Sequence, residues 1–139
     1  GARWFGKKRR EQLAALEFFL ALLNADIPQT CIENPVSIAS TRIAPPSQII
    51  HPWQFGHGES KTTCLWLRNL SRLKPTKIVE GREPRVHHEP PGKDRWRNRS
   101  RTYQGVADAM AAQWNNPRYR DYGLDIHWKS HLNRGKQNQ

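Results

Sequence analysis

An amphipathic stretch near the start of the chain constrains the fold most. Its leucines recur at intervals of three and four residues: Leu13, Leu16, Leu20 and Leu23. This is the spacing of one face of an α-helix, and the pattern predicts a helix from about Arg9 to Asn24. Because Phe19 and Leu22 widen the apolar stripe, we expect the helix to pack on a sheet or to be largely buried.

A short β-prone run, residues 30–32, follows the helix and ends at Glu33, Asn34 and Pro35. A helix followed by a strand with polar residues at its carboxyl end is typical of α/β sheets, where ligands gather at the strand ends. Glu33 and Asn34 are therefore the first candidate site residues. A turn that caps a following helix is an equally good interpretation of the same residues.

Two further strand-like segments, residues 48–55 and 62–67, are joined by a short connection that contains glycine. They predict an antiparallel pair at one side of the sheet. Residues 37–47 and 74–99 are predicted to be loops, and residues 100–114 a second amphipathic helix.

The chain is strongly basic, with 139 residues, a formal net charge of +11 and a pI near 10.4. Residues 71–139 carry 15 Lys and Arg against 7 Asp and Glu, whereas residues 1–70 carry 8 against 5. Such an excess favours a polyanionic partner, and nucleic acid is the one we expect. A solvated basic surface is the alternative.

The densest basic segment alternates cations with other residues between positions 93 and 101. In an extended segment this alternation places the cations on one side, spaced to follow phosphates, with an aromatic ring available for stacking on a base. The predicted DNA contacts there are Lys93, Arg95, Trp96, Arg97, Arg99 and Arg101.

The sequence does not show the patterns of a membrane protein, a secreted protein or a zinc-binding protein. No apolar run is long enough for a membrane span and no secretory signal is visible, so a location in the cytoplasm is expected. Cys31 and Cys64 are expected to be reduced and buried, although the sequence leaves a disulfide between them open. The histidines and cysteines lack the spacing of a zinc site, so no metal is predicted.

Four segments together resemble DNA cytosine methyltransferase-like proteins of phages and prophages. They are CIENP at 31–35, QIIHPWQFGHGESKTTCLWLRNL at 48–70, PTKIVEGRE at 75–83 and RSRTYQGVADAMAAQW at 99–114, with Arg3, Trp4 and Phe5 as a further similarity. The resemblance covers roughly residues 3–114, and the block at 48–70 is its most specific part.

The resemblance implies a role for several residues. Glu33 corresponds to a glutamate that engages the target cytosine and assists protonation of its ring, with Asn34 shaping the loop. Arg42 falls where relatives place a basic residue near the DNA or the base. The helix around residues 105–114 is similar to an element that completes the pocket for the methyl donor.

Two features of the family are missing from this sequence. The glycine-rich turn of the donor site and the Pro-Cys catalytic loop would both precede Gly1, and neither occurs elsewhere. We therefore expect an α/β fold with a partial Rossmann-like methyltransferase sheet, an antiparallel strand pair and two main helices. Residues 1–114 would form this incomplete region and 115–139 a basic polar tail. Methylation by this chain alone is not expected, and S-adenosylmethionine would bind only if the N-terminal part were supplied.

These observations lead to two interpretations of function. The first is a DNA-binding remnant of such a methyltransferase-like protein in a bacterial host. The second is a phage counter-defence protein, similar to an anti-CRISPR, that binds a host complex handling nucleic acid. Both allow a homodimer or a host protein to cover a sheet edge left exposed by the missing strands.

Overall fold

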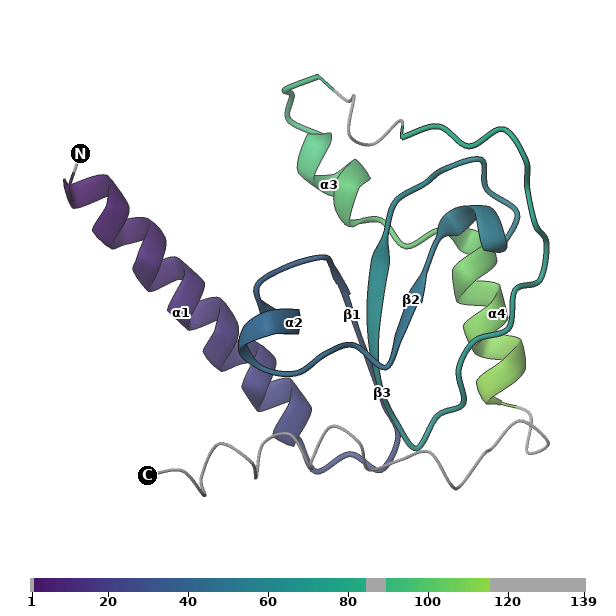
Figure 1. Ribbon diagram of the computed structural model, residues 1–139, viewed down its shortest axis with the longest axis horizontal. Coiled ribbons are helices and arrows are strands. Elements are labelled where there is room, and N and C mark those ends of the chain that lie inside the picture. The colour runs from purple at the N-terminus through teal and green to yellow at the C-terminus, as the bar shows by residue number, and fades with distance from the viewer. Residues whose placement is uncertain (1, 85–89, 116–139) are drawn as a thin grey trace.

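The computed structural model describes residues 2–84 and 90–115, without the side chains of residues 2–5 and 99. The described chain is a mixed α/β structure (Figure 1). Its three strands are β1 (Thr30–Pro35), β2 (Gln48–Ile50) and β3 (Thr63–Arg68), and its two long helices are α1 (Ala2–Asn24) and α4 (Gln104–Trp114). Its remaining elements are the short helices α2 (Ala39–Arg42) and α3 (Arg95–Ser100) and the 3-10 turn η1 (Pro52–Gln54).

The three strands form one sheet in the order β1-β3-β2, and β3 is antiparallel to both neighbours. The predicted antiparallel pair of the second and third strands is thereby confirmed. Since β1 and β2 both run opposite to β3, they are parallel to each other, with α2 in the connection between them. Strand β3 is buried from Thr63 to Leu67, as expected for a central strand covered on both faces.

Helices α1 and α2 cover one face of the sheet (Figure 1). On this face the Trp66 ring meets Phe19 edge-on, with centroids 4.8 Å apart, and its Nε1 donates a hydrogen bond to the Ala44 carbonyl at 2.9 Å. Arg68 fixes the end of α1 to the sheet, because its guanidinium donates hydrogen bonds to the carbonyls of Leu23 and Ala25. The Leu23 carbonyl belongs to the last turn of the helix, where acceptors lack partners within the helix, and Ala25 follows directly after the helix.

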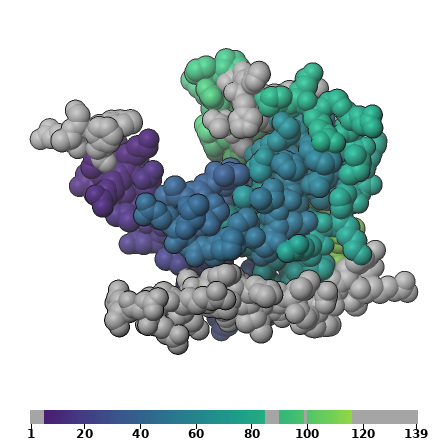
Figure 2. Space-filling view, viewed as in Figure 1, coloured from purple at the N-terminus to yellow at the C-terminus, as the bar shows by residue number. Residues whose placement is uncertain are grey.

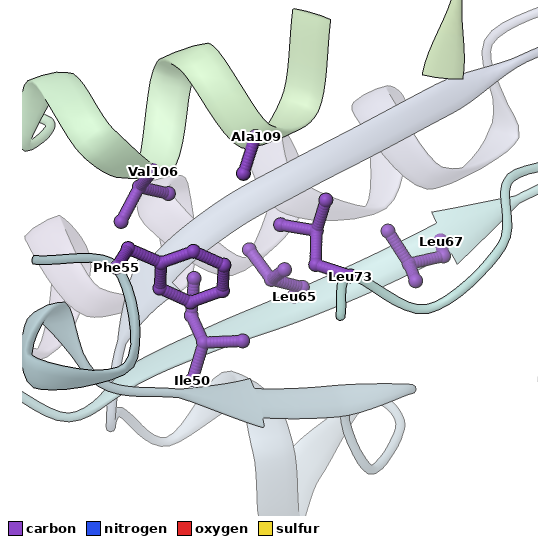
Figure 3. Packing of buried hydrophobic residues seen from close by; sticks show 7 residues of the cluster. All are labelled: Ile50, Phe55, Leu65, Leu67, Leu73, Val106 and Ala109. Atoms are coloured by element: carbon purple, nitrogen blue, oxygen red, sulfur yellow. The ribbon is translucent and has the colours of Figure 1, made fainter. Parts of the chain in front are cut away.

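Helix α4 covers the other face (Figure 3). Val106 and Ala109 point from the helix toward Phe55, Leu65 and Leu73, and all five side chains are buried. The C-terminal end of α4 is fixed by Gln113, whose side chain forms two hydrogen bonds with the backbone of Lys74 at 2.8 and 2.9 Å. The sheet is therefore the middle of three layers.

The two cysteines lie on opposite faces of this sheet. Cys64 belongs to the core under α1, whereas Cys31 packs against the core under α4. Both are free thiols, so the disulfide left open by the sequence is absent.

Several predicted boundaries need correction. Helix α1 begins at Ala2 rather than Arg9, and it is not largely buried, because residues 6–15 are exposed and only its second half packs. The predicted loop at 37–47 contains α2, and the segment 48–55 is a strand for only three residues before Pro52 starts the 3-10 turn. The second helix begins at Gln104, not at residue 100. From residue 116 on, the predicted tail lies outside the described residues.

Candidate nucleic-acid interface

A small pocket opens between the sheet and the start of α4. It combines residues from β1, from the end of β2 and the chain just after it, from the start of β3 and the chain just before it, and from the segment that leads into α4. Its lining consists of Glu33, Ile50, Pro52, Lys61, Thr63, Arg101, Thr102, Tyr103 and Val106. The enclosed volume of about 10 Å³ has room for roughly one water molecule.

Glu33 lies within β1, opposite Leu65 of β3. The prediction that it follows the strand is therefore wrong, because pairing with β3 continues as far as Pro35 opposite Thr63. Alternation along the strand directs Glu33 to the same face as Cys31, the face that α4 covers. The glutamate thus enters the pocket from the sheet rather than from a flexible turn.

The electrostatic environment of Glu33 has two opposing components. The residue keeps access to solvent, yet partial burial of its carboxyl group raises the pKa above the usual 4.5, and the positive charge of Lys61 lowers it by less. Lys61 is itself buried, with 9% of its surface exposed. A buried ammonium group requires a compensating partner, and Glu33 is one source of the negative charge it needs.

The start of α4 is held against the pocket by a close backbone approach. The amide of Gly105 donates a hydrogen bond to Nε2 of His57 at 2.9 Å, and the His57 ring lies 5.1 Å from that of Tyr103. A Cβ atom at Gly105 would stand 1.9 Å from the carbonyl oxygen of Phe55. Glycine is therefore required for Tyr103 and Arg101 to reach the pocket.

The pocket is suited to a ligand that carries both hydrogen-bond donors and negative charge. Glu33 can accept hydrogen bonds or, when protonated, donate one. Lys61 and Arg101 supply positive charge beside it, and the N-terminal end of α4 adds the positive end of its dipole. A nucleotide has this combination, with amino groups on its base and charge on its phosphates.

Helix formation changes the predicted basic segment. Residues 95–100 form α3, so the prediction of an extended segment with its cations on one side is wrong. In a helix, side chains two positions apart point about 200° apart, so Arg95 and Arg97 cannot follow the same phosphates. Arg97 instead pairs with Asp94 at 3.7 Å, and its guanidinium carbon lies 5.9 Å from the Trp96 ring centroid.

The basic segment nevertheless leads directly to the Glu33 pocket. Lys93, Trp96 and Arg97 are exposed, with 69% of the Trp96 surface accessible. Arg99 lies in α3 between them and Arg101, and its side chain is outside the described structure. Arg101 ends the helix in an extended conformation and lines the pocket. One continuous segment therefore joins the exposed cations of α3 to Glu33.

The other two predicted residues take different positions. The Asn34 side chain donates a hydrogen bond to Oγ of Ser37 at 3.0 Å, which braces the turn after β1. Arg42 ends α2 on the opposite side of the sheet and lines a separate groove against α1. The structure therefore brings Glu33 and Arg101 together but leaves Arg42 away from them.

Sequence reasoning missed Lys61, Tyr103 and His57 as members of this site. Lys61 precedes a strand in an ordinary polar linker, and its neighbour Glu33 is far away in the sequence. His57 lies between two glycines, which indicates a turn but not the element that the turn contacts. Its partner at Gly105 follows only from the packing of α4.

Comparison of the chain with protein-family models, with curated proteins and with solved structures finds no match. Within the residues that the structure describes, no helix is sufficiently long and apolar to cross a membrane.

Proposed function

We propose that this chain is the substrate-facing part of a DNA cytosine methyltransferase-like protein and that it binds DNA through the Glu33 pocket and the adjoining basic segment. The observation that carries the proposal is the convergence of Glu33, Lys61 and Arg101 on one pocket at the start of α4. A carboxyl group that exchanges a proton with cytosine benefits from a raised pKa, and partial burial supplies that shift.

The arrangement of layers supports the finer part of this proposal, a partial Rossmann-like sheet. Helices cover both faces, and the parallel strands β1 and β2 are linked through α2. Doubly wound sheets are covered in this way, and many of them include an antiparallel strand. Strand β3 pairs antiparallel with both of its neighbours, so the support for a Rossmann-like sheet is the layering and the α2 connection rather than the strand pairing.

The thiols support the expectation that this chain does not methylate alone. Cys31 lies on the same face of β1 as Glu33, but burial raises its pKa to about 12. A thiol with this pKa is almost entirely protonated at neutral pH, and only the thiolate attacks a base. Cys64 faces the opposite core. The region therefore supplies recognition of the base, and its own thiols do not supply the nucleophile.

Entry of a base requires the pocket to widen, because the present volume holds roughly one water. The lining segment 101–103 has no regular secondary structure, and Arg101 and Thr102 are exposed. Outward movement of this segment would admit a base extruded from the duplex, while the backbone contact at Gly105 keeps α4 in place. Unpaired bases enter such pockets with the least loss of stacking.

The test is the affinity for duplexes that differ in one central unpaired base, cytosine or thymine. We expect the protein to prefer cytosine by roughly 5- to 100-fold, the range for one well-paired base contact, because thymine lacks the exocyclic amine. Glu33→Ala should abolish this preference, whereas Glu80→Ala, at an exposed glutamate outside the pocket, should keep it. Equal binding of both duplexes by the unmodified protein would refute the role of Glu33.

A further inference from the structure

A second concave surface lies on the opposite side of the sheet, between α1 and α2. It is an open groove of about 600 Å³, and we call it the α1–α2 groove. Its lining includes Leu13, Leu16 and Ile38 together with Lys8, Arg9 and Arg42. Figure 2 shows the N-terminal half of α1, in purple, standing away from the rest of the described molecule beside the blue region that contains α2.

Two of the apolar residues that line the groove are exposed. Leu13 has 53% and Ile38 42% of their surfaces accessible. Leu16 is partly buried at the point where α1 meets the core. Adjacent exposed apolar side chains in a concave site mark a surface that another molecule covers. Helix α1 continues beyond them, with residues 6–15 exposed over about 15 Å at the α-helical rise of 1.5 Å per residue.

The charge of the lining residues indicates what kind of molecule covers the α1–α2 groove. Lys8, Arg9 and Arg42 are all exposed, and the lining contains no acidic residue. The occupant must therefore combine an apolar stripe with negative charge at its flanks. An acidic amphipathic helix has this pattern, because its apolar residues form one stripe and its carboxylates lie beside it.

The lining suits a peptide better than a nucleic acid. Single-stranded nucleic acids bind through aromatic side chains on which bases stack, and the groove is lined by aliphatic ones instead. A phosphate backbone laid across Leu13 and Ile38 would leave both without an apolar partner. A helix laid parallel to α1 would cover both and place its carboxylates near Arg9 and Arg42.

We infer that the α1–α2 groove binds an acidic amphipathic helix of a partner protein, on the side of the sheet opposite the Glu33 pocket. Binding would bury Leu13 and Ile38 under the apolar stripe of the partner, and Arg9 and Arg42 would fix its orientation through charge pairs. The two sites are independent, so the protein can hold DNA on one face and a protein on the other.

The test uses two synthetic peptides of roughly 14 residues, about four helical turns. Both carry leucine on one face, and the flanks are glutamate in the first and lysine in the second. Fluorescence anisotropy at about 150 mM salt measures their binding to the whole chain. We expect the glutamate peptide to bind. Its affinity should fall about tenfold in Arg9→Glu and in Arg42→Glu, since each puts like charges together.

Arg10→Glu is the matched control, because Arg10 is exposed on the same helix but does not line the groove. It should bind the glutamate peptide like the unmodified chain. The double variant Arg9→Glu, Arg42→Glu should gain affinity for the lysine peptide. Circular dichroism shows whether each variant keeps its fold. Leu13→Ser tests the apolar contact of the groove, because it leaves the charge of the groove unchanged.

Three results would overturn the inference. The first is that the glutamate peptide does not bind, and the second is that Arg10→Glu weakens its binding as much as Arg9→Glu does. The third is that the Arg9 and Arg42 variants bind the peptide normally but lose binding to a DNA duplex or to phosphatidylserine vesicles. The last result would assign the groove to nucleic acid or to a lipid surface. The proposed function is tested separately, because the cytosine preference depends on Glu33 and not on these residues.

Discussion

The imidazole of His57 accepts a hydrogen bond from the backbone amide of Gly105, with 2.9 Å between Nε2 and nitrogen. Helix α4 has no side-chain cap of its own, since Tyr103 at the N-cap position makes no such bond. The connection between β2 and β3 thus supplies the acceptor that a serine or aspartate usually gives. This contact positions both Tyr103 and Arg101 at the Glu33 pocket.

Replacing Gly105 with alanine should destabilise the protein by roughly 1–3 kcal/mol, the usual cost of overpacking. The added Cβ would stand 1.9 Å from the Phe55 carbonyl oxygen, so α4 must move away. Gly92→Ala is the control, because a Cβ there meets nothing within 4 Å. Urea unfolding measures the stability of both variants. A Gly105→Ala variant as stable as Gly92→Ala would show that α4 does not pack in this way.

Glu33 should make stability depend on pH. Its folded-state pKa is raised above the unfolded value of 4.5, so the folded protein binds this proton more tightly. The contribution to stability is complete below about pH 4.5 and is lost as the pH rises through the folded pKa. Glu33→Gln removes this titration, so the stability of the unmodified protein relative to the variant should fall across that window.

Urea unfolding of both proteins from acid to neutral pH measures that difference, with Glu80→Gln as the control for an exposed carboxylate. The contributions of the other titrating groups to the pH dependence of stability are the same in both proteins and cancel in the comparison. A difference that is constant, or one that grows with pH, would mean that the pKa of Glu33 is not raised.

Cys31 should react slowly with alkylating reagents in the folded protein. Burial raises its pKa to about 12 from 9.0, which lowers the thiolate fraction at neutral pH by roughly three orders of magnitude. Mass spectrometry after treatment with iodoacetamide should find Cys31 unmodified in native buffer and modified in urea. Cys64 is buried on the opposite face, where burial also raises its pKa, so it should show the same difference between native buffer and urea. Rapid native alkylation of Cys31 would contradict this and make Cys31 a candidate nucleophile beside Glu33.

Regular apolar patterns allowed parts of the fold to be predicted. The leucine spacing in α1 and the run of buried residues in β3 each follow from the residues of one element. The antiparallel pairing of β2 with β3 followed from the short glycine-containing connection predicted between them, although the actual connection runs from residue 51 to residue 62. The first turns of α1 were missed because Ala2 to Lys8 carry little apolar periodicity, although most of these residues tolerate a helix.

The site was less predictable because its contacts join distant segments. Glu33 was selected on its position after a short β-prone run, yet pairing with β3 extends β1 past it. The alternating cations gave no information on secondary structure, and residues 95–100 proved helical. The proximity of Lys61 to Glu33 depends on strand order, which no local pattern encodes.

The central claim is that this chain contacts DNA, and a binding titration of a DNA duplex at two salt concentrations tests it most directly. Arg95→Gln, Arg97→Gln and Arg101→Gln are compared with the unmodified chain, with and without S-adenosylmethionine. We predict binding that weakens steeply with salt, does not respond to S-adenosylmethionine, and loses part of its salt dependence for each contacting arginine removed. Binding that is absent at low salt, or that is the same at both salt concentrations, would contradict the proposal.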